Sequence, residues 1–187
     1  DEQRKELLAL LNEFKMCFAT NFNELGRVSD EFAMPIELEP GAKSFQSKPY
    51  KCSQKEREII NKMVADWKKH GIVRETASEF ASPVLLVPKK TKGEFRLAID
   101  YRRLNDMTKP MVFPLPETDD LLNGLTDSAI YSVLDLASGY NQFPLKEDDK
   151  SKTAFITQDE TGEFNFVPFG LKNAPVFFQK QLQIILA

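Results

Sequence analysis

The stretch YSVLDLASGYNQFPL, residues 131–145, places an acidic residue at the end of an apolar run. Tyr131, Val133 and Leu134 favour a β-strand, and Asp135 follows them directly. Small, turn-prone residues occupy positions 137–139, and an aromatic residue, Tyr140, comes next. A carboxylate in this position can cap the turn that follows it, or it can bind a metal ion. Taken alone, the stretch leaves both interpretations open.

The composition is that of a globular protein. The chain has 187 residues, of which 42% are hydrophobic and 11% aromatic, too apolar for a disordered segment. Its two cysteines, Cys17 and Cys52, cannot form a disulfide framework or a zinc knuckle, and they fit a reducing compartment. The single histidine, His70, precedes Gly71 and is expected at a helix end. There is no signal peptide and no apolar run that could span a membrane, so we expect a protein that is not secreted and has no membrane partner.

The net charge of −3 hides a gradient along the chain. Residues 1–40 hold nine acidic and four basic residues, whereas residues 89–109 hold seven basic and three acidic ones. Such a basic segment is either a solvated face or a contact surface for a polyanion.

Hydrophobic spacing predicts an α+β fold. An apolar repeat over residues 7–18 and a capping box, Ser53 with Glu56, indicate two helices, of which the second ends at Gly71. Residues 83–100 read as a hairpin whose TKGE turn carries basic residues at its tip.

The second half of the chain continues this pattern. Residues 109–125 are predicted as an extended, proline-rich segment entering a short helix, and residues 152–158 and 162–168 as two strands joined by a DETG turn. A last helix begins near Asn173, its expected N-cap, with Pro175 in the first turn.

Three segments in this order carry a family resemblance. VPKKTKGEFRLAIDYRRLN (87–105), LDLASGYNQF (134–143) and VPFGLKNAPVFFQ (167–179) together resemble the reverse transcriptases of gypsy-type LTR retrotransposons. The resemblance extends from about Ile36 onward. It implies the fingers and the first part of the palm of a right-hand polymerase, with antiparallel strands and packed helices. Residues 41–187 would form this unit, and residues 1–40 a linker and N-terminal helix preceding the polymerase.

For the opening stretch, the resemblance implies a metal site and a sugar contact. Asp135 would be the catalytic carboxylate, and together with the Leu136 carbonyl it would hold Mg²⁺, with Mn²⁺ as a possible substitute. Tyr140 would stand beneath the nucleotide sugar and crowd a ribose 2′-hydroxyl. Core packing is the alternative role for Tyr140.

For the hairpin and the late loop, the resemblance implies contacts with the nucleotide. Either Lys89 or Lys90, together with Arg96, would bind the triphosphate, although a surface ion pair is the alternative for Arg96. Phe169 and Gly170 would line the nucleotide and template side, with Phe169 packing rather than hydrogen bonding.

The remaining basic residues are expected to contact nucleic acid. These residues are Lys92, Arg102 and Arg103, although Arg102 also reads as a structural ion-pair partner of Asp100. The acidic residues 147–149 are expected to form a solvated turn rather than a second metal site.

The resemblance defines an expected function and its partners. The family carries two further metal-binding aspartates in a tyrosine–x–Asp–Asp hairpin after the helix that begins at Asn173, and the sequence ends at Ala187. We therefore expect an RNA-directed DNA polymerase segment that is inactive alone. Its partners would be an RNA or DNA template with primer, deoxynucleoside triphosphates and the remainder of a Pol polyprotein, in cytoplasmic virus-like particles. The alternative is a non-catalytic nucleic-acid- or protein-binding module derived from such a polymerase.

Overall fold

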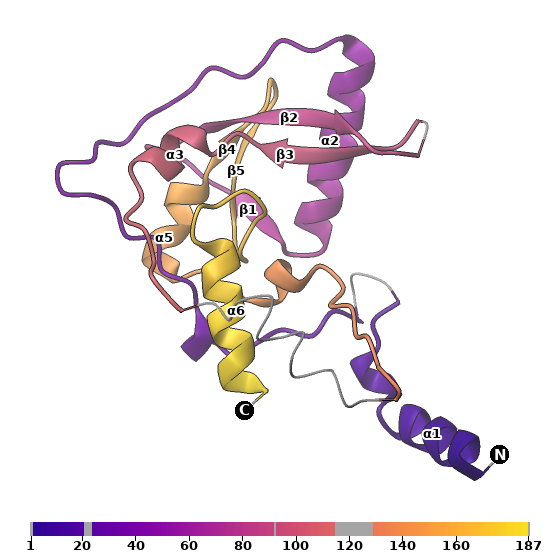
Figure 1. The fold of residues 1–187 in the computed structure, drawn as a ribbon. Helices are drawn as coiled ribbons and strands as arrows, with labels where there is room; N and C mark the ends of the chain where they lie inside the picture. The colour runs from indigo at the N-terminus through magenta and orange to yellow at the C-terminus, as the bar shows by residue number, and fades with distance from the viewer. Residues whose placement is uncertain (1, 21–23, 92, 115–128, 187) are drawn as a thin grey trace.

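A five-stranded sheet organises the part of the chain that the computed structural model describes, residues 2–20, 24–91, 93–114 and 129–186 (Figure 1). The strand order is β1-β5-β4-β2-β3, and all neighbours are antiparallel except β2 and β4. The strands are β1 (Val73–Glu75), β2 (Ser82–Pro88), β3 (Phe95–Ile99), β4 (Phe155–Ile156) and β5 (Thr161–Phe164). The predicted α+β class and both predicted hairpins are confirmed.

Helix α2 (Gln54–Lys69) forms because its ends and its apolar face are both encoded locally. The Ser53 side chain accepts a hydrogen bond from the Glu56 amide, and the Glu56 carboxylate accepts one from the Ser53 amide, which completes the predicted capping box. The helix ends before Gly71, which adopts φ +66°, the left-handed region that glycine tolerates. Trp67 packs against the rings of Phe155 and Phe164 and so fixes α2 on the sheet.

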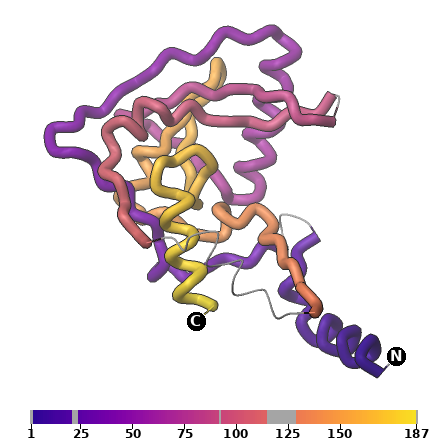
Figure 2. Tube along the Cα trace, in the orientation of Figure 1, coloured from indigo at the N-terminus to yellow at the C-terminus, as the bar shows by residue number. Residues whose placement is uncertain are grey.

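The other helices are short, apart from those at the two ends of the chain. They are α1 (Glu2–Glu13), η1 (Lys15–Cys17), η3 (Asp30–Phe32), α3 (Arg102–Asp106), η4 (Gly139–Gln142), α5 (Glu147–Lys150), η5 (Ser151–Thr153) and α6 (Ala174–Ile185). Helix α1 projects from the body of the molecule (Figure 2). It buries none of its side chains. No helix among the described residues combines the length and apolarity needed to cross a membrane.

The core extends into the segment that we assigned to the linker. Met34 and Ile36 are 1% and 2% exposed, and they belong to the same hydrophobic cluster as the sheet residues. The Met34 amide donates to the Pro144 carbonyl at 2.8 Å. The buried Ile36 amide donates to the Asp149 carboxylate at 2.9 Å. Residues 34–36 therefore pack with the rest of the fold.

The strand predicted over residues 131–134 does not form. This segment pairs with no strand of the described residues, and Val133 and Leu134 are 91% and 80% exposed. Strand propensity alone does not hold an extended segment, because its backbone groups need a neighbouring strand as a partner. The short helix predicted after residue 114 lies mostly outside the described residues.

Asn173 occupies the predicted N-cap position of α6, but its side chain does not cap the helix. Its Nδ2 donates to the Lys109 carbonyl at 2.8 Å, and its Oδ1 accepts from the Met111 amide at 3.0 Å. The side chain therefore ties the segment after α3 to the start of α6.

Candidate functional site

A cleft of ≈ 580 Å³ opens between the β2–β3 hairpin, α2 and two loops, and we call it the hairpin cleft. Lys89 and Arg96 line it from the hairpin, and Trp67 lines it from α2. Phe169 and Gly170 line the opposite side. The cleft therefore gathers four of the predicted nucleotide-binding residues from sequence segments about 75 residues apart. The family motifs did not indicate Trp67.

The two cationic residues of the cleft have different surroundings. Lys89 Nζ lies 3.3 Å from Glu94 Oε2 across the hairpin turn, and both side chains are about half exposed. Such a surface pair contributes roughly 0–1 kcal/mol, so an anionic ligand can compete for the lysine. Arg96 is exposed and forms no ion pair within the part of the chain that the structure describes. Lys90 is exposed beside Lys89, and Lys92 lies outside the described residues.

Tyr140 stands in an aromatic cluster next to the cleft. Its ring centroid lies 5.0 Å from that of Phe169 and 5.1 Å from that of Phe178 on α6. The turn before it is unusual: Ser138 has φ +46° and ψ +45°, the left-handed region, and lines the cleft. Tyr140 is half-buried, so it packs on the core cluster while it stays beside a cleft-lining ring.

Gly170 lies on the side of the cleft opposite the hairpin, where its backbone conformation and hydrogen bonds position the loop. Its φ of +97° strains any residue with a side chain. Its carbonyl accepts from Asn105 Nδ2 at 2.8 Å, and the Lys172 amide donates to Asn105 Oδ1 at 2.8 Å. Asn105 thus pins the loop that carries Phe169, a role that the sequence did not indicate. Phe169 itself is 63% exposed, so it packs against Tyr140 and leaves much of its ring to solvent.

Asp135 and Leu136 lie just before this turn, in the exposed segment without strand pairing. No group of three or more His, Cys, Asp or Glu side chains that could hold a metal ion occurs among the described residues. Mg²⁺ usually binds through one or two carboxylates together with substrate phosphates and waters. Asp135 therefore fits the role of a single ligand in a larger set.

Arg102 and Asp100 form the ion pair that the sequence suggested. The guanidinium donates to both carboxylate oxygens, at 2.8 and 2.7 Å, and the Tyr50 hydroxyl adds a third hydrogen bond at 2.7 Å. The hydrogen bonds from Arg102 hold the pKa of Asp100 well below its ordinary value. Arg103 lies over the Phe45 ring, with 4.5 Å between the guanidinium carbon and the ring centroid. Both arginines are exposed, although each has a structural contact.

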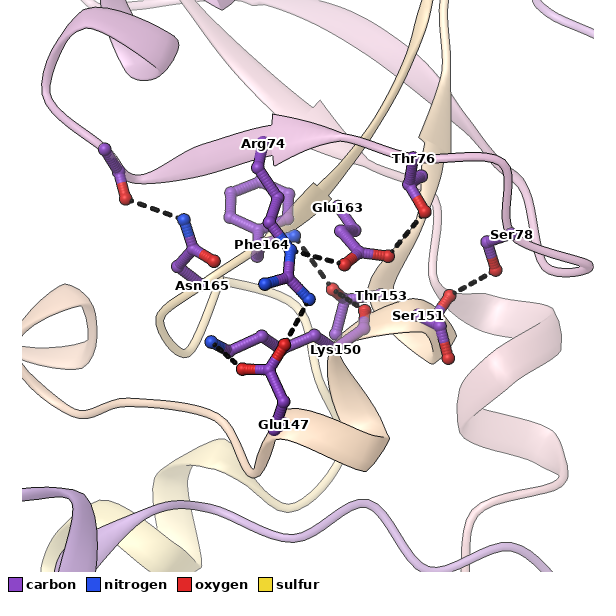
Figure 3. Close-up of polar contacts among 11 residues, drawn as sticks. Arg74, Thr76, Ser78, Glu147, Lys150, Ser151, Thr153, Glu163, Phe164 and Asn165 are labelled. Carbon is purple, nitrogen blue, oxygen red and sulfur yellow. Dashed lines mark hydrogen bonds and ion pairs between the residues drawn. The ribbon is translucent and has the colours of Figure 1, made fainter.

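The acidic residues 147–149 begin α5, and the run is only partly solvated: Glu147 and Asp148 are exposed, as predicted, whereas Asp149 is buried. Arg74 bridges Glu147 and the buried Glu163, with N–O distances of 2.5 and 2.7 Å (Figure 3). Hydrogen bonds from Lys150 and then Arg74 lower the pKa of Glu147. Asp149 is buried against the Ile36 amide. Arg74 and Ile36 lie far from these acidic residues in sequence, so local patterns could not reveal these two contacts.

Comparisons with known proteins identify the family of the chain. The family model described as "Reverse transcriptase (RNA-dependent DNA polymerase)" matches residues 87–187. The chain is 35% identical over 191 residues to the Drosophila melanogaster "Retrovirus-related Pol polyprotein from transposon opus", covering 100% of this chain and 19% of that protein. It is 32% identical over 182 residues to the Schizosaccharomyces pombe "Transposon Tf2-3 polyprotein", covering 97% of this chain and 14% of that protein.

The fold is also similar to that of a solved structure. A crystal structure of a prototype foamy virus protease–reverse transcriptase superposes with a TM-score of 0.82 at 23% identity, covering 99% of this chain and 24% of that chain. The chain thus spans about a fifth of the length of the opus relative. The resemblance to retrotransposon reverse transcriptases is confirmed, and the chain belongs to the reverse transcriptase family.

Proposed function

We propose that this chain supplies the nucleotide-binding part of an RNA-directed DNA polymerase, which adds deoxynucleotides to a primer on an RNA or DNA template. The observation that carries this proposal is the convergence of Lys89, Arg96, Phe169 and Gly170 on the hairpin cleft. The volume of the cleft, ≈ 580 Å³, falls within the range of about 300–1,000 Å³ that small-molecule sites occupy. Family membership supplies the class of reaction.

The hairpin side of the cleft suits a triphosphate. Arg96 can offer a planar fork of N–H donors to phosphate oxygens, and Lys89 can exchange its exposed contact with Glu94 for a second phosphate contact. Lys90 stands next to Lys89 and is the alternative lysine for this role.

The opposite side suits the sugar and the base. Tyr140, supported by Phe169 and Phe178, would stand beneath the sugar and leave room for a 2′-deoxyribose but not for a 2′-hydroxyl. The backbone at Gly170 allows a base or template nucleotide to approach closely.

Asp135 and the Leu136 carbonyl would hold a divalent ion, Mg²⁺ or Mn²⁺. The metal would neutralise the triphosphate and activate the primer hydroxyl. A two-metal reaction needs more carboxylates than the described residues bring together, so we propose that Asp135 acts with acidic residues of another polymerase segment. Pairing with that segment would also complete the strand over residues 131–134. The remainder of a Pol polyprotein is the partner that this proposal requires, within cytoplasmic virus-like particles.

Basic residues would hold the nucleic acid. Lys90 would approach the backbone of the template–primer from the hairpin, and Arg102 and Arg103 from α3. The sequence resemblance implies the same role for Lys92, which lies outside the described residues. Such contacts with phosphates do not depend on sequence, and they weaken as salt increases.

Nucleotide binding can be measured directly, because Trp67 is the only tryptophan of the chain and lines the cleft. A deoxynucleoside triphosphate should quench its fluorescence in a saturable titration with Mg²⁺ present. Arg96→Gln should weaken binding about tenfold or more, because a charge-assisted hydrogen bond contributes about 1.5–3 kcal/mol. Arg4→Gln on the projecting α1 is the matched control and should bind like the unaltered chain. Equal affinities of both variants, or no quenching by nucleotide, would contradict the proposed site.

A further inference from the structure

We propose that Phe178 and Gly139 together fix the position of the Tyr140 ring, and so determine how much room is left for the nucleotide sugar. Phe178 acts in this proposal as a positioning residue, since its ring contacts Tyr140 and is not among the residues that line the cleft. The inference rests on the proposed nucleotide site and identifies what controls its choice between deoxyribose and ribose.

Gly139 and Phe178 lie in closer contact than any side chain at position 139 would allow. A Cβ atom on Gly139 would lie 2.8 Å from Cζ and 3.1 Å from Cε2 of Phe178, and 3.4 Å from the Leu136 Cβ. In proteins, non-bonded heavy atoms essentially never lie within 3.0 Å of a Cβ atom. The Phe178 ring therefore rests directly on the backbone of the turn that carries Tyr140.

The same ring supports Tyr140 from the side. Phe178 meets Tyr140 edge to face, with centroids 5.1 Å apart and planes at 83°. On its other side it meets Phe143, with centroids 5.5 Å apart and planes at 78°. Since Phe143 is 3% exposed and belongs to the core, Phe178 cannot retreat without disturbing buried packing. The position of Tyr140 is thus fixed between the Phe178 ring and the cleft-lining Phe169.

The turn itself leaves Tyr140 little freedom to move by another route. Ser138 has a positive φ, and its carbonyl accepts from the Asn141 amide at 2.8 Å. The Asn141 side chain donates to the Val167 carbonyl at 3.2 Å, which ties the turn to the strand-end segment before Phe169. The backbone of the turn is therefore restrained by hydrogen bonds, whereas the contact between Phe178 and Tyr140 can be removed by a single substitution.

Two substitutions should affect sugar selection differently. Phe178→Leu removes the ring that supports Tyr140 and lets the tyrosine move away from the cleft, which makes room for a 2′-hydroxyl. Gly139→Ala adds a methyl group between the turn and Phe178, which pushes the aromatic cluster toward the cleft and leaves less room. The first should relax selection against ribose, and the second should preserve or strengthen it.

The test measures dissociation constants of dTTP and of UTP carrying the same 5-methyl group, by quenching of Trp67 with Mg²⁺ present. In Phe178→Leu, the dissociation constant of the ribonucleotide divided by that of the deoxynucleotide should fall about fivefold or more. A site that fits or excludes one small group changes selectivity by about 10- to 200-fold, and the substitution should remove part of that effect. Phe178→Tyr keeps the ring and should retain the original ratio. Gly139→Ala should not lower it.

Phe177→Leu is the matched control. This neighbour on α6 also packs against Phe143, with centroids 5.7 Å apart, but it is not among the aromatic contacts of Tyr140. It should destabilise the fold to urea comparably with Phe178→Leu while keeping the selectivity ratio. Equal ratios in Phe178→Leu and Phe177→Leu, or a fall in Gly139→Ala as large as in Phe178→Leu, would overturn the inference. If the unaltered chain binds neither nucleotide, the proposed function itself fails, so the two failures are distinguishable.

Discussion

Replacing Asp149 with alanine tests whether residues 34–36 belong to the folded unit. Asp149 is 9% exposed, and its Oδ2 accepts the hydrogen bond of the buried Ile36 amide at 2.9 Å. Its Oδ1 pairs with Lys152 Nζ, which also donates to the Ile36 carbonyl at 2.8 Å. One carboxylate and one ammonium group thus satisfy both backbone groups of Ile36.

The expected loss follows from these contacts. A buried amide left without an acceptor costs about 1–3 kcal/mol. Loss of the ion pair with Lys152 adds to this, because both side chains are mostly buried, at 12% and 22% exposure, and the ammonium group would lose its charge partner. Asp149→Ala should therefore lower the free energy of unfolding by about 2–3 kcal/mol. Asp149→Asn keeps an acceptor for the Ile36 amide and should lose about 1 kcal/mol.

Urea unfolding monitored by Trp67 fluorescence provides the measurement. With a slope of about 2–3 kcal/mol per molar urea, the Asp149→Ala midpoint should fall by about 1 M at unchanged slope. Asp148→Ala, at the exposed neighbouring carboxylate, should stay within about 0.5 kcal/mol of the unaltered chain. A midpoint for Asp149→Ala equal to that of Asp148→Ala would refute the claim that this carboxylate anchors the segment.

Three further predictions concern pH, salt and activity. Hydrogen bonds from Arg57 lower the pKa of Asp159 to about 2, so this pair should add stability above about pH 4 that is lost as the pH falls toward 2, and Arg57→Gln should flatten that part of an acid-unfolding curve. Lys89→Ala/Lys90→Ala should reduce the log–log salt slope of template–primer binding by roughly 0.9 per lost phosphate contact in a fluorescence anisotropy titration, whereas Lys62→Ala on α2 should not change it. The chain alone should give no primer extension with Mg²⁺ or Mn²⁺, because the described residues gather no multi-carboxylate site, and extension above background would contradict this expectation.

Features encoded by near neighbours were predictable from the sequence. The capping box of Ser53 and Glu56 and the glycine-containing turn of the β2–β3 hairpin are local signals, and both are present in the fold. The contact of Asp149 with Ile36 spans 113 residues, and that of Arg74 with Glu163 spans 89, so no local pattern indicated either of them. For this reason, the sequence predicted a solvated turn for the acidic residues 147–149.

Residues 131–134 show that a local signal can also predict an element that does not form. These residues have high β propensity, yet the segment is exposed and forms no strand pairing within the described part of the chain. Propensity describes how a side chain suits a pleated surface, whereas strand formation also needs a partner.

The candidate site was partly predictable for a different reason. The family motifs indicated Lys89, Arg96, Phe169 and Gly170 together, and these residues converge on one cleft. The contact of Gly139 with Phe178 escaped prediction because it depends on the orientation of one ring.

Single-nucleotide incorporation tests most directly the claim that this chain contains a polymerase nucleotide site with Tyr140 at the sugar. The assay uses the full-length product of the gene that encodes this chain and compares kcat/KM for a dNTP and the matching rNTP. Tyr140→Val should keep dNTP incorporation and reduce sugar discrimination by about tenfold or more, since each ~1.4 kcal/mol of lost steric exclusion is a factor of ten. Asp135→Asn should abolish incorporation of both nucleotides, because it removes a charged metal ligand. Equal losses on both nucleotides in Tyr140→Val, with unchanged discrimination, would contradict the account.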